Sequence, residues 1–308
     1  MPMSVIALDV SGSRITGEAV AASGRVLDAY RTPVRPELGP DDVVDSVLDC
    51  ADRLAAGAAR EGDPAVAAGI VVPGLVDEAS GTVLYAAGLG WYDMPVGDWL
   101  GEHIRLPVAV GHDVRAGAVA ESRLGAGRGC ANFAYVPVGA GVAAALMLGG
   151  RPLGSDRGGA GEIGHLVVRP SGPRCACGNR GCVETLASAP AIADRYTCLT
   201  GEAGVSAQEV QRRAALGDET AAEIWQEALE ALADGLAALT RVVDFDRIVL
   251  GGELVEAGPA FFAPLRGALA ERLTFRPPPR LTAAKLGGRV GCLGAALLAE
   301  DLRAPAAA

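Results

Sequence analysis

Four side chains able to hold a metal ion lie close together in the middle of the chain. The segment from 164 to 184 reads GHLVVRPSGPRCACGNRGCVE. It contains one of only three histidines and three of only seven cysteines: His165, Cys175, Cys177 and Cys182. One imidazole and three thiolates form a ligand set typical of a tetrahedral structural Zn²⁺. Gly178 and Gly181 leave the backbone room to fold around such an ion.

A disulfide and a redox centre are the alternative uses of such a cluster. A redox centre normally has Cys-x-x-Cys spacing, which this segment lacks. Disulfides belong to oxidising compartments, whereas the opening residues MPMSVIALDV have neither the basic start nor the cleavage-like site of a secretory signal. We therefore expect a reducing, cytoplasmic location, with zinc favoured over a disulfide. The other four cysteines stand in apolar stretches and are expected to be small core residues: Cys50, Cys130, Cys198 and Cys292.

Acidic side chains flank this cluster on both sides. Glu162 stands three residues before His165, and Glu184 stands two residues after Cys182. An imidazole bound to zinc keeps a second nitrogen for an outer partner. The metal would then make the loop rigid enough to present Glu162, His165 and Glu184 to a ligand rich in hydroxyl groups, such as a sugar.

Two aspartates stand at the ends of predicted strands. The stretch AVGHDVRAG places His112 and Asp113 where a strand meets a helix, the edge at which α/β sheets bind ligands. An aspartate there suits a general base for a hydroxyl nucleophile in phosphoryl transfer, or a plain helix N-cap. Asp9 ends the strand SVIALDV beside the turn SGS. It suits a water-bound Mg²⁺ next to a phosphate, or an Asx turn.

Three glycine-rich turns also follow predicted strands: DVSGS at 9–13, VGAG at 138–141 and LGGE at 250–253. Glycine lets backbone N–H groups approach a phosphate closely, although any such turn taken alone is more often an ordinary hairpin. A P-loop is excluded, because the single lysine, Lys285, does not follow a glycine-rich loop.

The elements that must position these residues form two similar halves. Apolar runs predict strands at 4–10, 14–20, 25–34, 65–76 and 107–114, with helices at 41–60 and 115–127. Strand, glycine turn, strand and Gly-Arg hairpin recur from 134 to 153. A helix with Ile224, Ala228, Leu232 and Leu236 in one row and a strand at 247–252 follow. We therefore predict a duplicated α/β fold of two domains with a cleft between them. The boundaries expected are 1–118, joined by a C-terminal helix at about 290–303, and 119–289, which holds the zinc-binding loop 165–184.

Composition limits the possible partners. The 308 residues carry a net charge of −10, so nucleic acid and anionic membranes are unfavourable partners. Residues 129–150 carry no charge, but five glycines and Pro137 favour strand, turn and strand over a membrane helix.

Together these motifs resemble the ROK family of repressors, open reading frames and sugar kinases. GGAGEIGHLVV at 158–168 followed by CACGNRGCVE at 175–184 is similar to the family signature, with all four presumed zinc ligands at the family spacing. ALDVSGSRI and VGAGVA resemble its two phosphate motifs, GHDVRAG its catalytic segment and IVLGGELVEAG its adenosine motif.

The resemblance implies an actin-like, ribonuclease H-like ATPase fold and an ATP-dependent hexose kinase of the glucokinase type. Asp113 would take the proton from the sugar hydroxyl. The resemblance further implies three groups of residues: sugar ligands His112, Glu162, His165 and Glu184; Mg²⁺ and phosphate ligands Asp9, Gly12 and Ser13; and nucleotide-binding Gly139, Gly141, Gly251 and Gly252. Family members are commonly homodimers or homotetramers.

Five positions, in four motifs, depart from the family pattern. The family usually has Gly-Gly-Thr where this chain has Ser11, Gly12 and Ser13, threonine at Ala140, asparagine at His112 and a third glycine at Glu253. The hydroxyl missing at Ala140 removes one phosphate hydrogen bond, worth about 0.5–1.5 kcal/mol. Two alternatives to a glucokinase follow: a sugar-binding sensor with weakened catalysis, and a kinase for N-acetylmannosamine, N-acetylglucosamine, fructose or allose. A DNA-binding repressor is disfavoured by the acidic chain and by a first strand that begins at about Ser4.

Overall fold

The structure is a computed structural model that describes residues 3–155 and 157–303. It contains two compact units. The first comprises the chain up to Leu124 together with 154–160 and the segment from Gly288, and the second comprises 125–153 and 161–287. The boundary expected after residue 118 falls inside helix α3 (Asp113–Leu124), which lies whole in the first unit. Ala116 of α3 touches Gly294, where an added Cβ would meet the Ala116 backbone, so this helix is tied to the C-terminal one.

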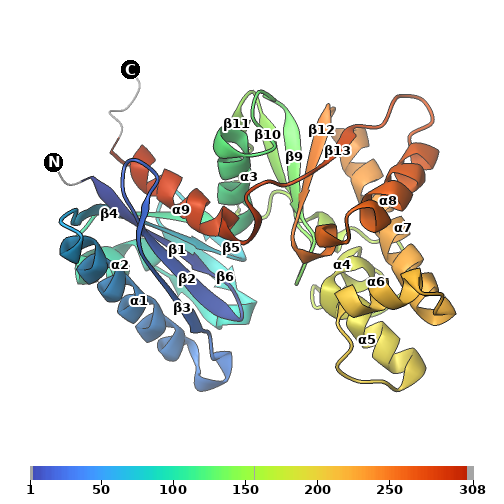
Figure 1. Ribbon diagram of the computed structural model, residues 1–308, viewed down its shortest axis with the longest axis horizontal. Helices are drawn as coiled ribbons and strands as arrows, with labels where there is room; N and C mark the ends of the chain where they lie inside the picture. The colour runs from blue at the N-terminus through green and yellow to red at the C-terminus, as the bar shows by residue number, and fades with distance from the viewer. Residues whose placement is uncertain (1–2, 156, 304–308) are drawn as a thin grey trace. The chain divides into compact units, whose positions relative to one another are not determined.

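A five-stranded sheet forms the centre of the first unit (Figure 1). In spatial order it consists of β3 (Val26–Pro33), β2 (Arg14–Val20), β1 (Ser4–Val10), β4 (Ala65–Val72) and β8 (Val108–His112). β1, β4 and β8 run parallel to one another. β2 is antiparallel to β1, and β3 is antiparallel to β2. The predicted apolar runs therefore form strands, although the run at 65–76 is interrupted after Val72 and continues as β5 (Leu75–Asp77).

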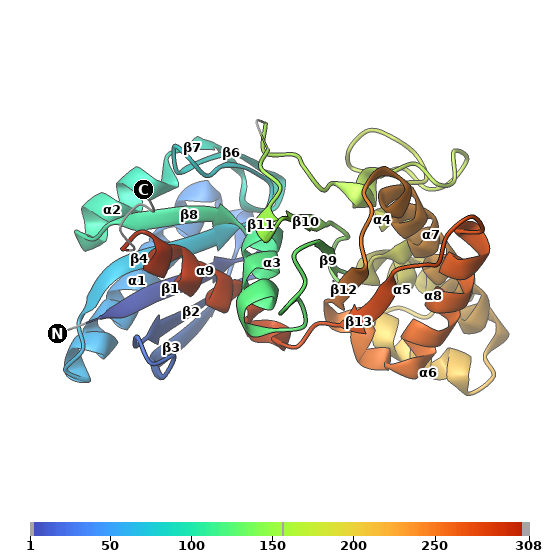
Figure 2. The same cartoon turned by 90° about the horizontal axis from the view of Figure 1, so that it is seen from above.

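Helices cover both faces of this sheet. Ile6 and Leu8 of β1 face the core under α1 (Pro40–Arg60), whereas Val5 and Ala7 face α9 (Val290–Asp301). Figure 2 shows α9 lying along β1 and β4. A small antiparallel sheet of β5, β6 (Thr82–Ala86) and β7 (Trp91–Met94) and helix α2 (Val96–Ile104) complete the unit.

The second unit repeats this sheet. Its strands are β11 (Arg151–Pro152), β10 (Ala145–Leu148), β9 (Phe133–Pro137), β12 (Arg247–Gly251) and β13 (Arg280–Ala283). Their order and directions match those of the first sheet, strand for strand. The duplication predicted from the sequence is therefore confirmed.

The remaining helices belong to the second unit. They are α4 (Glu184–Ala187), α5 (Ala189–Thr200), α6 (Ala207–Ala215), α7 (Glu219–Val242) and α8 (Pro259–Arg272). Five 3₁₀ turns also occur in the described chain: η1 (Pro36–Leu38), η2 (Ala87–Leu89), η3 (Ile163–His165), η4 (Glu253–Ala257) and η5 (Gly287–Arg289). The row predicted on α7 is buried throughout, as expected for its core face.

The structure corrects one detail of the sequence analysis. Cys198 lies exposed on α5 and Cys130 is partly exposed, so only Cys50 and Cys292 are small core residues among the four so predicted.

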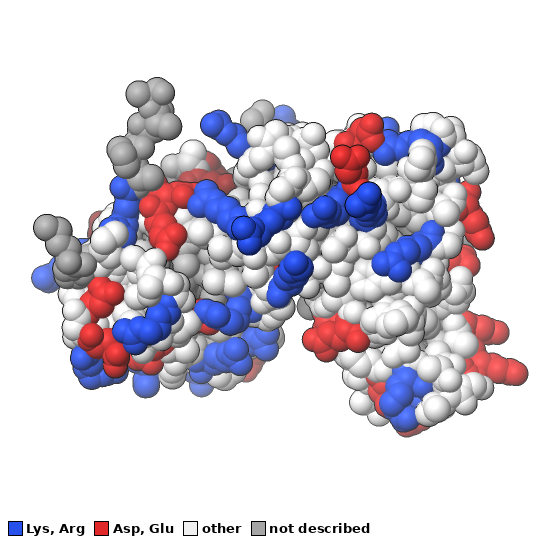
Figure 3. Space-filling view, turned by 45° about the horizontal axis from the view of Figure 1, so that its top comes forward, with Lys and Arg blue, Asp and Glu red and all other residues white. Residues whose placement is uncertain are grey.

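The long uncharged stretch at 129–150 forms β9 and β10. Across residues 3–155 and 157–303, each helix is either too short or too polar to cross a bilayer. Figure 3 shows basic and acidic side chains interspersed with uncharged areas on one face of the molecule.

Candidate active site and metal centre

In the first unit, the predicted aspartates lie at one edge of the sheet. Asp9 is paired with Val71 in the parallel β1–β4 register, and Val72 is paired with His112 in the β4–β8 register. The carboxyl ends of all three parallel strands thus meet at one edge, where ligands bind in α/β sheets. Gly12 and Ser13 form the exposed turn between β1 and β2, beside Asp9.

The Asp9 carboxyl lies against the start of α9. A Cβ at Gly291 would collide with this carboxyl, so only glycine leaves it room. Burial raises the pKa of Asp9 to about 6, and the nearby Arg14 guanidinium only partly opposes that rise. A bound divalent cation favours the ionised form of such a carboxylate. The position and chemistry of Asp9 therefore fit a carboxylate that would hold Mg²⁺ through its water.

Asp113 opens helix α3 and keeps a third of its side chain exposed. Its Oδ1 atom accepts a hydrogen bond from the Val114 N–H at 2.7 Å. The His112 imidazole lies beside it, with Nε2 at 3.5 Å from Oδ1. Burial, with a smaller contribution from the charge of Arg115, lowers the pKa of His112 to about 4. The ring beside Asp113 is therefore neutral at pH 7.

In the second unit, the two predicted nucleotide-binding turns meet at Val138. The Val138 N–H donates to the Gly251 carbonyl, and the Val138 carbonyl accepts from the Leu254 N–H. Gly252 has a φ of +84°, and a Cβ there would collide with the Val138 carbonyl. The glycine at 252 is thus required for the close approach of the two turns.

Glu184 lies against the 139–141 turn. Its Oε2 atom accepts a hydrogen bond from the Val142 N–H at 2.9 Å. A Cβ at Gly141 would lie 2.7 Å from the same oxygen. Ala140 is exposed in this turn, and Glu253 lies beside it, held by Gln208 at 2.6 Å. A carboxylate predicted to bind a sugar therefore contacts a turn predicted to bind phosphate.

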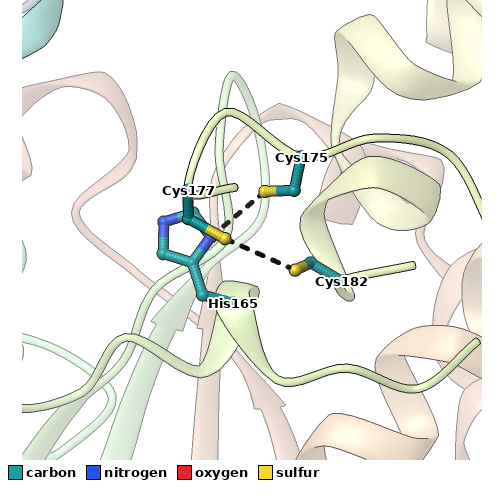
Figure 4. Close-up of side chains that lie close together, drawn as sticks. All are labelled: His165, Cys175, Cys177 and Cys182. Atoms are coloured by element: carbon teal, nitrogen blue, oxygen red, sulfur yellow. Dashed lines mark hydrogen bonds between the residues drawn. The ribbon is translucent and has the colours of Figure 1, made fainter. Parts of the chain in front are cut away.

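The four presumed zinc ligands converge (Figure 4). One ligand atom from each of His165, Cys175, Cys177 and Cys182 lies within 4.8 Å of all the others. The Cys177 and Cys182 sulfurs are 3.7 Å apart, and the Cys175 sulfur is 3.4 Å from His165 Nδ1. Tetrahedral Zn–S bonds of about 2.3 Å put neighbouring sulfurs about 3.8 Å apart. The donor set and its spacing fit Zn²⁺.

The thiols also fit a metal better than a disulfide. All seven cysteines lie in the described ranges and are unpaired, and 3.7 Å is far beyond an S–S bond of about 2 Å. Burial raises the pKa of Cys182 to about 12, whereas the backbone N–H of Asn179 lowers the pKa of Cys177. Zinc binding would hold all three sulfurs as thiolates.

Glu162 lies beside the ring nitrogen of His165 that faces away from the sulfurs. His165 Nδ1 faces the sulfurs, and its Nε2 lies 3.8 Å from Glu162 Oε2. This geometry leaves Nδ1 for the metal, while Nε2 lies near the Glu162 carboxylate but beyond hydrogen-bond distance from it. Both side chains are about one third exposed, so a ligand can reach them.

Two residues near Asp113 were missed by the sequence analysis. Arg115 of α3 is buried and donates from Nε to Glu78 Oε1 at 2.8 Å. Glu78 Oε1 also accepts the His112 backbone N–H at 3.0 Å. The only sequence signal was a lone arginine among the small residues of DVRAGAVA.

Comparison with known proteins gives three findings. The ROK family profile matches residues 5–302. The chain is 28% identical to the glucokinase of Streptomyces coelicolor, over 96% of this chain and 97% of that one, and 31% identical to the N-acetylmannosamine kinase of Escherichia coli O157:H7, over 97% and 99%. The crystal structure of a ROK family glucokinase from Streptomyces griseus in complex with glucose and AMPPNP superposes with a TM-score of 0.83 at 29% identity, covering 97% of this chain and 99% of that one.

Proposed function

The chain belongs to the ROK family, and we propose that it is an ATP-dependent kinase that phosphorylates a hexose, with glucose as its first candidate substrate. The observation that carries the proposal is the connection made by Glu184. One end of the zinc loop carries this carboxylate, and the carboxylate contacts the glycine turn at 139–141. A sugar held by Glu184 would therefore lie next to a phosphate held by that turn.

In the proposed reaction the sugar hydroxyl oxygen bonds to the γ-phosphorus as the bond to the ADP oxygen breaks. Asp113 accepts the hydroxyl proton, and Glu162, His165 and Glu184 hold the sugar. Gly139, Gly141, Gly251 and Gly252 would approach the nucleotide, while Asp9, Gly12 and Ser13 would lie at its phosphates. Mg²⁺ bound with ATP would neutralise the phosphate charge, and Zn²⁺ would fix the sugar loop.

The choice of glucose rests on similarity to glucokinases at 28–29% identity. The comparable identity to an N-acetylmannosamine kinase keeps N-acetylated hexosamines as the next candidates. We also propose a homodimer or homotetramer in the cytoplasm, with neither nucleic acid nor membrane as a partner.

The function is tested by ADP release with Mg²⁺-ATP and a panel of hexoses, on protein of measured zinc content. Release that depends on one sugar would establish the kinase and identify its substrate. Binding of a hexose with no release from any sugar would instead support a sensor, the second candidate. The sensor is favoured by two departures from the family pattern, Ala140 and Glu253. The Glu253 side chain lies close to the glycine turn, because a Cβ placed at Gly139 would be 3.8 Å from its Cγ atom.

Ala140→Thr should lower the KM for ATP about threefold to tenfold, the effect of one added phosphate hydrogen bond. The side chain at 140 is exposed, so a threonine fits without repacking. Ala131→Thr, at another exposed position of the same unit, is the matched control and should leave KM unchanged. An unchanged KM in both variants would show that the turn does not hold phosphate.

The raised pKa of Asp9 predicts that activity falls at acidic pH. Because only its ionised form would hold Mg²⁺, kcat/KM for Mg²⁺-ATP should fall about tenfold per pH unit below about 6. A profile that stays flat down to pH 5 would contradict a metal-binding role for Asp9.

The same pKa gives a test on the metal-free protein. Asp9 has a pKa of about 6 in the folded state against an ordinary 3.8, so its protonated form favours folding. That contribution is complete below pH 3.8 and is lost as the pH rises through 6. Asp9→Asn should therefore stabilise the apo protein at pH 7 by up to about 3 kcal/mol while impairing Mg²⁺-ATP binding. Denaturation curves at pH 5 and 7 measure the difference.

A further inference from the structure

The side chain of His112 is directed into the protein. Only 4% of the residue is exposed, and its backbone N–H is bound by Glu78. Its Nδ1 atom lies 3.4 Å from the backbone nitrogen of Arg115, and its Nε2 atom lies 3.5 Å from Asp113 Oδ1. Both ring nitrogens therefore face protein groups, which leaves neither for a sugar hydroxyl.

These contacts determine which nitrogen holds the proton. A backbone N–H points at Nδ1, so Nδ1 must offer a lone pair. The ring is neutral at pH 7, and a neutral imidazole carries its single proton on the other nitrogen. The proton thus lies on Nε2, the atom that faces the Asp113 carboxylate.

Arg115 holds this arrangement in place. Its Nε atom donates to Glu78 Oε1 at 2.8 Å. Its Nη1 and Nη2 atoms donate to the backbone carbonyls of Gly158 at 3.3 Å and Val76 at 3.4 Å. Glu78 Oε1 accepts from both Arg115 and the His112 backbone. The Arg115 side chain is therefore anchored by three hydrogen bonds. The end of β8 at His112 is anchored by a bond to the same Glu78 oxygen.

We propose that His112 is a positioning residue, whose Nε2–H donates to Asp113 Oδ1 and orients that carboxylate for proton transfer. This role rests on the proposed kinase function, and it replaces the sugar contact expected for His112 from the sequence. Sugar recognition is thereby assigned to Glu162, His165 and Glu184.

Two amide variants separate the roles. The glutamine amide nitrogen reaches about as far as histidine Nε2, whereas the shorter asparagine side chain ends near the position of Nδ1. His112→Gln should keep kcat within about threefold, because the hydrogen bond to Asp113 is retained. His112→Asn and His112→Ala should lower kcat about tenfold to 100-fold, as expected for losing one hydrogen bond to a charged group, with little change in the KM for the hexose.

A sugar-binding role predicts the reverse pattern. His112→Asn, which installs the residue usual in the family, would then be fully active, and His112→Ala would raise the KM for the hexose with kcat unchanged. Either result would overturn the proposal. Thermal melting and zinc content report whether each variant is folded. If His112→Ala does not fold, the glutamine and asparagine pair still decides.

A second readout does not depend on turnover. The chain has three histidines, so ring ¹⁵N spectra are assignable by comparison with His112→Gln. The expected spectrum shows His112 as the neutral Nε2–H form at pH 6, and an Nδ1–H form or a charged ring would refute the proposal. If the unmodified protein phosphorylates no sugar, the kinase function fails, and the spectrum alone decides whether His112 donates to Asp113.

Discussion

Asp113→Asn should lower kcat by about 10²–10⁴-fold while hexose affinity stays within about threefold. The amide is nearly isosteric with the carboxylate and can still accept the Val114 N–H, so the start of α3 should persist. The amide cannot take the proton of the attacking hydroxyl. The side chain is one third exposed, which leaves it within reach of a substrate. Single-turnover phosphorylation gives the rate of the chemical step, and calorimetric titration gives the affinity for the sugar.

The control for this variant is Asp45→Asn, the same change at an exposed position of α1. It should match the unmodified protein in both rate and affinity. A rate for Asp113→Asn within about fivefold of that control would remove Asp113 from the base role. A loss of hexose affinity equal to the loss in rate would instead make Asp113 a binding residue.

The sequence predicted well those features that depend on local pattern. Apolar runs gave the strands of the first sheet and all strands of the second except β13, because a buried strand needs little beyond β-branched and small apolar residues between turns. The clustering of His165 with the three cysteines was likewise predictable, since a candidate ligand set lying within one loop is visible in the sequence. Asp9 stood out because it lies at the end of a predicted strand, and Asp113 because it directly follows one.

The features that escaped prediction depend on tertiary contacts. No prediction was made for Arg115 from the sequence, and arginine is seldom buried without a partner. Its partner Glu78 is 37 residues away and becomes its neighbour only when β5 lies beside β8. The segment 154–160 belongs to the first unit although the chain on both sides of it belongs to the second. Local patterns contain no information on such a crossing, so a continuous second domain was expected.

Cys177→Ser should release the zinc and weaken hexose binding at least about tenfold, because His165 and Glu162 lose their fixed geometry. Cys177 is the suitable ligand to change. Its side chain is exposed, so serine removes a metal ligand with little loss of packing, whereas Cys182 is fully buried. The loop from 166 to 183 has little regular structure of its own, only the isolated bridges Val167–Cys182 and Arg174–Arg180. Without the metal, the two remaining sulfurs, those of Cys175 and Cys182, lose the ion that would hold them near His165.

Cys198→Ser provides the matched control, since Cys198 is also exposed, on α5, and lies outside the four-ligand cluster. It should retain one zinc per chain and normal hexose affinity. Elemental analysis, thermal melting and sugar titration of the two variants distinguish a metal effect from a general effect of removing an exposed thiol. A zinc-free Cys177→Ser protein that binds the hexose normally would contradict the role of the metal in shaping the sugar loop. A Cys177→Ser protein with full zinc content would show that Cys177 is not a ligand.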